Sequence, residues 1–361
     1  MPKSLTTREA QNQRRANPNP NRMHQAGQAA NHAACKVVFS EYRERLSKHT
    51  RRRQFSDLNV FGDYLRSIGL TPGDTVNDPQ AWECVTWGLL EDFKRWMLQQ
   101  GYAVSTVNIR LTTARVYAAL AVKAGVLHES DLPMIRFVKG FAHKEATHID
   151  KQREDAGIET RRSLRRNGAV SNRKWAAIKI GGDQAQQLKV QPDNPKGKRD
   201  ALLMCILLDH GLRVGEVSSL NVQDFNLEHE TMTFYRPKVY KIQTHNLTED
   251  TLAAARAYFE QVGPIEGNLW CQSRKSRSGE LVVEARGMSP RAITKRVGAL
   301  GEDIGLVSLS PHDCRHYWAN QAARNGTPLD RLMQAGGWNS PEMPLRYIQE
   351  AEIANEGVKL D

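Results

Sequence analysis

Two stretches of the sequence place arginine and histidine where their side chains could bind a small anion. Arg213 lies in His-Gly-Leu-Arg-Val-Gly-Glu-Val, and His312 and Arg315 lie in Ser-Pro-His-Asp-Cys-Arg-His. If a helix begins at Pro311, His312 and Arg315 are one turn apart on one face, so an imidazole and a guanidinium could converge on one anion. A histidine that caps a helix beside a surface arginine gives the same pattern, so this pair alone is weak evidence.

A tyrosine and a lysine add a nucleophile and a proton donor. Tyr347 lies nine residues after Trp338, and Lys238 lies in Arg-Pro-Lys-Val-Tyr-Lys between two expected strands. A tyrosine hydroxyl, with a pKa of about 10, attacks only after it loses its proton or after nearby cations lower that pKa. A lysine ammonium can protonate a departing oxygen. Lys241, three residues further on, is a rival for that role.

The ordered set of these residues resembles the signature of the tyrosine recombinases, the phage integrase family: Arg213, Lys238, His312, Arg315, Trp338 and Tyr347. The nine-residue spacing from Trp338 to Tyr347 is similar to the spacing in that family. By motif the resemblance covers roughly residues 172–350, whereas residues 33–125 resemble the family's core-binding domain only in their helical character. Lys238 is preferred over Lys241 because it lies earlier in the turn, as the family's lysine does.

The resemblance implies that Tyr347 attacks a DNA phosphodiester. A covalent 3′-phosphotyrosyl link would keep the energy of the broken bond until a free 5′-hydroxyl rejoins the strand. Attack on phosphorus gathers negative charge on the nonbridging oxygens, and the forked donors of Arg213 and Arg315 suit that charge. No cluster of carboxylates with metal-ligand spacing accompanies these residues, so we expect neither a metal ion nor ATP as cofactor.

Three further side chains support this hypothesis. His312 can accept and return protons near neutral pH. Trp338 stands where many family members have histidine, and because an indole N–H only donates, proton transfer falls more heavily on His312. Glu216 follows Arg213 by three residues and is expected to orient it, although an ordinary helix salt bridge has the same spacing.

The composition agrees with a nucleic-acid partner. The 361-residue chain has 51 Lys and Arg against 40 Asp and Glu, which gives a net charge of +11 and a pI of about 9.5, so a polyanion is the expected partner. The resemblance implies that this polyanion is double-stranded DNA. The five cysteines are scattered without a C-x-x-C pair. No run of about 18 apolar residues occurs. We therefore expect a cytoplasmic, nucleoid-associated protein without a disulfide framework, a zinc site or a membrane segment.

The apolar pattern predicts a mainly α fold with a small β-sheet, in which a helical bundle precedes an α+β catalytic domain. The expected segments are a flexible basic arm over 1–32, a helical, SAM-like core-binding domain over 33–140, a basic linker over 141–172 and the catalytic domain over 173–361. In the last segment, strands are expected over 177–180, 232–235 and 241–247, and helices over 184–189, 199–212, 251–262 and 290–304.

Basic side chains outside the anion-binding set are expected to contact DNA. They are Arg110 in the bundle, Arg161, Arg162, Arg165 and Arg166 in the linker, and Arg286, Arg291 and Lys295 in the catalytic domain. Contact with phosphate is more frequent for such residues than base readout. For the linker arginines, a solvated tether is an alternative to a strap across the DNA backbone.

The favoured function is a site-specific recombinase that integrates or excises a phage or another mobile element. The alternatives are a type IB-like DNA topoisomerase and a DNA-binding regulator with an inactive site. By resemblance, the protein would act as a homotetramer on DNA, with accessory directionality or bending proteins. The segment after Tyr347 predicts a short amphipathic helix that docks on a neighbouring copy or packs on its own copy. Whether Tyr347 acts in cis or in trans stays open.

Overall fold

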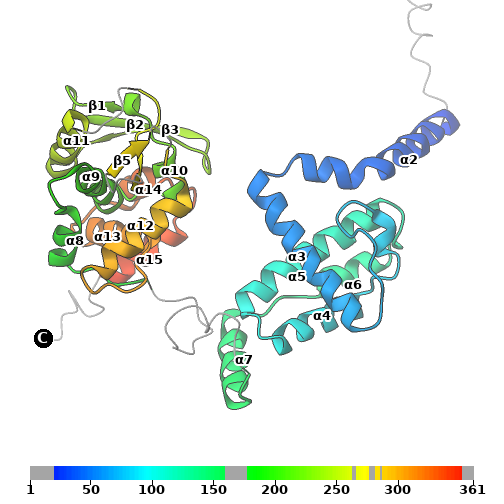
Figure 1. Ribbon diagram of the computed structural model, residues 1–361. Coiled ribbons are helices and arrows are strands. Elements are labelled where there is room, and N and C mark those ends of the chain that lie inside the picture. The colour runs from blue at the N-terminus through cyan, green and yellow to red at the C-terminus, as the bar shows by residue number, and fades with distance from the viewer. Residues whose placement is uncertain (1–19, 159–176, 262–265, 276–280, 285–286, 352–361) are drawn as a thin grey trace, which may run out of the picture. The chain divides into compact units, whose positions relative to one another are not determined.

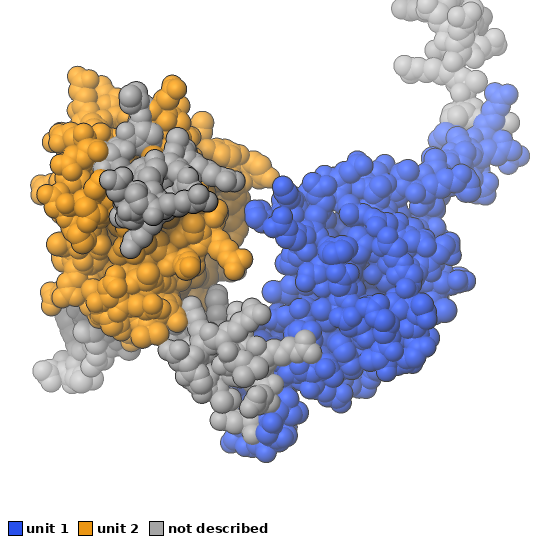
Figure 2. Space-filling model, in the orientation of Figure 1, with its two compact units in different colours: residues 1–175 blue, residues 176–361 orange. Residues whose placement is uncertain are grey.

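The computed structural model describes residues 20–158, 177–261, 266–275, 281–284 and 287–351. The chain divides into two compact units, residues 1–175 and 176–361 (Figure 2). Both are mainly helical, and the strands that the structure describes all lie in the second unit (Figure 1). The expected mainly α fold with a small sheet is confirmed.

The first unit is a bundle whose aromatic side chains pack around helix α5. Its elements are α2 (Pro20–Glu44), α3 (Lys48–Ser67), the 3₁₀ turn η1 (Pro79–Trp82), α4 (Trp87–Gln99), α5 (Val104–Lys123), α6 (Asp131–Phe137) and α7 (His143–Asp155). The rings of Phe61 and Trp82 stack with centroids 5.3 Å apart, and Tyr117 of α5 stacks on Trp82 at 6.0 Å. Burial of such large rings supplies much of the stability of a small helical domain.

Two helices of this unit lie partly or wholly in segments where the sequence predicts no helix. Helix α2 begins at Pro20, inside the expected flexible arm, and α7 lies inside the expected linker. The prediction of a flexible arm is therefore wrong from Pro20 onward. It relied on the absence of an amphipathic period, whereas α2 is rich in the strongest helix former, at Ala26, Ala29, Ala30, Ala33 and Ala34.

The second unit is built around helix α9. Its elements are α8 (Gly182–Lys189), α9 (Pro195–Asp209), α10 (Val214–Ser218), η3 (Val222–Asp224), β1 (Phe225–Asn226), β2 (Thr231–Arg236), β3 (Lys241–Asn246), α11 (Glu249–Gln261), β4 (Gln272–Lys275), β5 (Leu281–Glu284), α12 (Pro290–Glu302), α13 (Pro311–Arg324), α14 (Leu329–Gly336) and α15 (Glu342–Ala351). Asn194 caps α9 by accepting the N–H of Gly197 at 2.9 Å. Consecutive side chains from Leu202 to Leu208 are buried, as suits a helix covered on all sides.

Strands β1, β2 and β3 form an antiparallel sheet in that order, and β4 pairs with β5 separately. Along β2 every second side chain points inward, so Met232, Phe234 and Arg236 are buried. Arg236 lies opposite Lys241 of β3 in the register of the hairpin. The turn between these strands carries Lys238, so β2 and β3 fix where that lysine stands.

Most predicted elements of this unit are confirmed, with one error. Helices α8, α9, α11 and α12 and strands β2 and β3 lie at the expected positions. The strand expected over 177–180 is wrong, because the N–H of Ile178 donates to the Asp313 carboxylate of α13 at 3.1 Å instead of to a neighbouring strand. No helix in the described ranges combines the length and the apolar content that crossing a bilayer requires.

Candidate active site

Arg213 begins helix α10, where Glu216 holds it. The Glu216 carboxylate accepts the backbone N–H of Arg213 at 2.9 Å and the Nη1–H of its guanidinium at 2.9 Å. The side chain of Glu216 is 3 % exposed, whereas that of Arg213 is 26 % exposed. Arg213 is therefore fixed at its backbone and at one edge of its guanidinium, and part of its surface stays accessible to a ligand.

Arg236, at the end of β2, bonds the same carboxylate. Its Nη1 donates to Glu216 Oε2 at 2.7 Å, and its Nη2 donates to the carbonyl of Ala335 at 2.6 Å. Its Nε donates to Oε1 of Gln243 on β3. The side chain is fully buried. Because burial disfavours the charged form, the pKa of the Arg236 guanidinium lies below its ordinary value.

Arg315 of α13 is the third arginine of the site, and its side chain is 3 % exposed. Its Nη1 donates to the carbonyl of Gly211 and its Nη2 to the carbonyl of Gly336, both at 2.5 Å. Its pKa is lowered to about 9, mainly by burial and in addition by the positive charges of Arg213 and Arg236. These three arginines, called the arginine centre below, are thus electrostatically coupled.

The end of helix α14 receives hydrogen bonds from all three arginines. Four consecutive backbone carbonyls, those of residues 334–337, each accept a hydrogen bond from a side chain. The donors, in order along the chain, are Gln243, Arg236, Arg315 and Arg213. The last carbonyls of a helix lack partners within the helix and form the negative end of its dipole, which attracts cations. The arginines therefore cap α14, and α14 in turn orients the arginines.

Glycine at position 337 makes this close approach possible. Gly337 ends α14 with φ +61°, a left-handed conformation that glycine adopts at little cost. A Cβ at this position would stand 2.6 Å from Cδ of Arg236. Any larger residue would therefore push Arg236 away from the carbonyl of Ala335.

The arginine centre carries an excess of positive charge. Within the part of the chain that the structure describes, Glu216 is the one carboxylate bonded to this centre, and it bonds Arg213 and Arg236 but not Arg315. The carbonyl partners orient the arginines without neutralising them, and a buried charge is costly unless it is paired. The centre is therefore arranged to receive an anion, and paired guanidiniums suit a phosphate group.

Tyr347 of α15 lies beside the arginine centre. Trp338 connects the two, because its ring stands 4.3 Å from Cζ of Arg315 and its centroid is 5.9 Å from that of the Tyr347 ring. Tyr347 also contributes to the electrostatic environment of Arg315. The residue is 2 % exposed, so Tyr347 is buried in this structure.

Two histidines of α13 lie on the other side of Tyr347. The Nε2 atoms of His312 and His316 are 3.1 Å apart, and the His316 ring centroid is 5.2 Å from that of Tyr347. His312 is exposed, whereas Arg315 is buried, so the two residues have different surroundings although they are one helical turn apart. His316 thus forms a bridge between His312 and Tyr347.

Lys238 is exposed in the turn between β2 and β3, two residues after Arg236. Lys241 is exposed at the start of β3. Both ammonium groups therefore lie at the surface at the tip of the hairpin, and the geometry does not choose between them. The sequence motif still favours Lys238.

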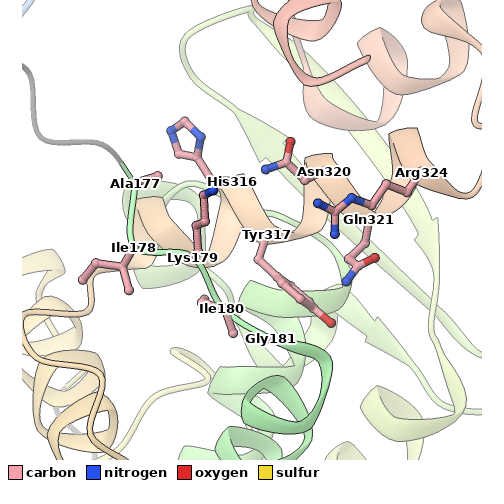
Figure 3. A pocket seen from close by; sticks show the side chains of 10 residues that line it. All are labelled: Ala177, Ile178, Lys179, Ile180, Gly181, His316, Tyr317, Asn320, Gln321 and Arg324. Atoms are coloured by element: carbon pink, nitrogen blue, oxygen red, sulfur yellow. The ribbon is translucent and has the colours of Figure 1, made fainter. Parts of the chain in front are cut away.

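A pocket of about 570 Å³ lies beside α13, next to His316. Figure 3 shows its lining side chains, which come from residues 177–181 and from α13. The Oδ1 atom of Asn320 is buried there and accepts no hydrogen bond within the described residues. In the described ranges, no group of three or more His, Cys, Asp or Glu side chains is arranged to hold a metal ion.

Sequence reasoning missed Arg236, Gln243 and His316. Arg236 directly precedes Pro237 and Lys238 in the motif already singled out, and the inward alternation of β2 was a usable signal for its burial. His316 lies one helical turn after His312, which was a second signal. The role of Gln243 had no signal in the sequence, because its partner is the backbone carbonyl of Gln334.

The residues expected to contact DNA have unequal surroundings. Arg291 and Lys295 are exposed and one turn apart on α12. Arg110 instead packs over the Tyr102 ring at 4.1 Å and lies 3.7 Å from Asp57, with 14 % of its side chain exposed. The remaining candidates lie outside the described residues: Arg161, Arg162, Arg165, Arg166 and Arg286.

Comparison with known proteins identifies relatives. Residues 179–353 match the model of the phage integrase family. Tyrosine recombinase XerC of Vibrio cholerae is 24% identical over 295 residues, which cover 81% of this chain and 79% of that protein. Tyrosine recombinase XerA of Pyrococcus furiosus is 27% identical over 141 residues, 39% of this chain and 46% of that protein. The match therefore spans about half the length of the archaeal relative.

Solved structures share the fold. An integrase of the Tn1549 transposon, in complex with a circular intermediate DNA, superposes with a TM-score of 0.58 at 13% identity and covers 87% of this chain and 94% of that one. A lambda integrase dimer bound to a core site superposes with a TM-score of 0.55 at 12% identity and covers 90% of this chain and 78% of that one. At these identities the likeness shows the fold alone.

Proposed function

Since the chain belongs to the phage integrase family of tyrosine recombinases, enzymes of site-specific DNA recombination, we propose that Tyr347 cuts DNA and holds the strand as a 3′-phosphotyrosyl ester. The single observation that carries this proposal is the arginine centre, where three guanidiniums lie together beside the tyrosine and, among the described residues, only one carboxylate, Glu216, is bonded to two of them. A phosphodiester supplies the missing negative charge. Arg213, the most exposed of the three, and Arg315 bind its nonbridging oxygens.

The proposed reaction moves one proton in each direction. Tyr347 Oη forms a bond to phosphorus, and its proton passes to the pair of His316 and His312, because imidazole is the side chain best suited to general acid–base catalysis near neutral pH. The bond from phosphorus to the 5′ oxygen breaks, and Lys238 donates a proton to that oxygen. Rejoining reverses both transfers. The number of phosphoester bonds stays constant, so the cycle needs no ATP.

The proposed substrate is double-stranded DNA of a phage or another mobile element. Several transposon and phage integrases with this fold are described in complex with DNA. The net charge of +11 supports a DNA partner, with binding that weakens as salt rises.

Recombination of two duplexes calls for four copies of the chain, and accessory proteins would set its direction. The pocket beside α13 is a candidate acceptor for the segment after Tyr347 of a neighbouring copy.

Covalent trapping tests the proposed function. Duplexes that the protein retains from a randomised pool define a preferred site, and that site is then synthesised with a nick next to each candidate phosphate. Cleavage releases a short oligonucleotide, so an adduct accumulates. We expect the wild-type protein to form an adduct that survives denaturation, and Tyr347→Phe to bind the same DNA without one.

Two results would contradict this proposal. An adduct of undiminished yield with Tyr347→Phe would mean that another residue is the nucleophile. Adducts on every sequence tried, together with relaxation of supercoiled plasmid, would indicate a topoisomerase. Mass spectrometry of the DNA-linked peptide identifies the attached residue in either case.

A further inference from the structure

Arg236 is the most deeply buried member of the arginine centre, and none of its side-chain surface is exposed to a DNA phosphate. Its side chain is fully buried, and its Nε, Nη1 and Nη2 atoms all donate hydrogen bonds within the protein. Its guanidinium also packs over the Phe234 ring at 4.8 Å. A role in the reaction must therefore act through the residues that it holds.

Those partners belong to three parts of the site. Glu216 holds Arg213, and Ala335 lies at the end of α14, whose carbonyls also orient Arg315. Gln243 belongs to β3 and itself donates to the carbonyl of Gln334 at 2.6 Å. Arg236 and Gln243 thus join both strands of the hairpin to the end of α14. Among the described residues, further polar links to this end come from Arg213, Arg315 and His245 of β3.

The position of Lys238 depends on the same contacts. Arg236 is the last residue of β2, and Lys238 follows two residues later in an exposed turn. A turn takes its direction from the strands that carry it, so the anchor at Arg236 sets where the lysine ammonium stands relative to Arg213 and Arg315. A misplacement of about 1 Å in such a group can slow a reaction by about 100-fold.

We propose that Arg236 is a positioning residue that holds the Lys238 turn in register with the two phosphate-binding arginines, by bonding Glu216, Gln243 and the end of α14. This inference rests on the proposed function, because it assumes that Lys238 protonates the leaving oxygen. It assigns Arg236 no contact with DNA.

The test measures adduct formation in a single turnover with two versions of the nicked site. One has the ordinary phosphodiester, and the other has sulfur in place of the bridging 5′ oxygen. A thiol, with a pKa of about 8.5, leaves without a proton donor. Variants Arg236→Met and Arg236→Lys are compared with Lys238→Ala, and DNA affinity and unfolding midpoint are recorded for each.

Arg199→Met is the matched control. Arg199 is 4 % exposed in the same unit and also bonds a carboxylate and a carbonyl, those of Asp200 and Cys271, away from the site. A double variant, Glu216→Gln with Arg236→Met, removes both charges of the buried pair, so that no unpaired charge is left to prevent folding.

We expect Arg236→Met to bind DNA as the wild type does and to cleave the ordinary site about 100-fold more slowly. The sulfur substrate should relieve at least about tenfold of that loss, as it should for Lys238→Ala. Compared with Arg236→Met, the double variant should have a higher unfolding midpoint but an equally slow rate of adduct formation. Arg199→Met should lose stability and keep its rate.

Three results would overturn the inference. A rate for Arg236→Met equal to that of Arg199→Met would leave Arg236 with a structural role only. Equal losses on both substrates would break the link to Lys238. Recovery of the rate in the double variant would mean that only the unpaired charge matters. Wild-type adduct formation is scored first and separately, because its failure would count against the proposed function.

Discussion

Arg199 and Arg315 are both almost fully buried in the second unit, yet they are neutralised differently. Arg199 donates to the Asp200 carboxylate at 2.8 Å, and Asp200 also binds Arg296 at 2.7 Å. Arg315 donates to two backbone carbonyls, and no carboxylate is bonded to it in the described residues. The charge of Arg199 is therefore neutralised by a carboxylate of the protein, whereas the charge of Arg315 is available to neutralise a bound anion.

This difference shows how a folded protein can hold a buried positive charge that is available to bind an anion. Hydrogen bonds that Arg315 donates to two carbonyls satisfy its N–H groups and fix its orientation, but they leave its positive charge in place. The lowered pKa of Arg315, about 9, reflects that burial and the nearby Arg213 and Arg236. A bound phosphate would relieve this cost, so the centre is expected to bind the anion strongly.

The largest expected effect comes from removing the unneutralised charge. Arg315→Met should slow adduct formation by about 100-fold to 1,000-fold, because a lost donor to a developing negative charge costs roughly 3 kcal/mol. Arg199→Met should leave the rate per folded molecule unchanged. Single-turnover trapping measures both. If Arg199→Met slowed adduct formation as much as Arg315→Met, the two arginines would not differ in the way proposed.

The next effect separates the two lysines of the hairpin. Lys238→Ala should slow cleavage by about 100-fold, as the loss of a general acid does. Lys241→Ala should stay within a few fold, with a weaker dependence of DNA binding on salt because it loses a phosphate contact. The same trapping experiment, run at two salt concentrations, distinguishes them. If Lys241→Ala slowed cleavage more than Lys238→Ala, Lys241 would be the proton donor and Lys238 the phosphate contact.

A smaller effect compares the two buried carboxylates. Glu216→Gln and Asp200→Asn each leave buried arginines without their counter-charge, so both should lower the free energy of unfolding by about 3 kcal/mol. Only Glu216→Gln should also slow cleavage, by about tenfold, because Arg213 and Arg236 lose their common support. Urea denaturation and trapping report the two quantities. A slowed rate with Asp200→Asn would show that stability alone explains the loss.

The smallest effect is the response to acid of two histidines near Arg236. The pKa of His210 is lowered to about 4 and that of His245 to about 3, in both cases mainly by burial, and the positive charge of Arg236 contributes to the second shift. Between about pH 6.5 and 4 the unfolded chain binds protons that the folded chain does not. Stability should therefore fall as pH falls through this range, by up to about 1.4 kcal/mol per pH unit for each histidine.

Urea midpoints at pH 7 and pH 5 measure this response. His210→Gln should reduce the loss between the two values. Identical losses in the wild type and in His210→Gln would show that His210 does not stay neutral in the folded chain.

Several structural features around the candidate site could be predicted because they depend on nearby residues in the sequence. The start of α13 is an example, since Ser310 and Asp313 bond across the first turn at 2.6 and 2.9 Å and Pro311 opens the helix. The alternation of β2 and the turn that carries Lys238 were equally readable from residue types.

The anchoring of the arginine centre could not be predicted, because its partners are backbone atoms far away in sequence. Arg213 and the carbonyl of Gly337 are 124 residues apart, and Arg236 and that of Ala335 are 99 residues apart. Residue types carry no information about such carbonyls. The helix of the expected arm was missed for another reason, because alanine favours a helix without producing an apolar period.

The most direct test of the account is a structure of the protein on its nicked site with orthovanadate in place of the scissile phosphate. We predict that vanadium is bonded to Tyr347 Oη and that its free oxygens lie about 3 Å from Arg213 and Arg315, with Arg236 still on Glu216 and the end of α14. Vanadate bound to another side chain, or guanidiniums that face elsewhere while Tyr347 holds the vanadate, would contradict it.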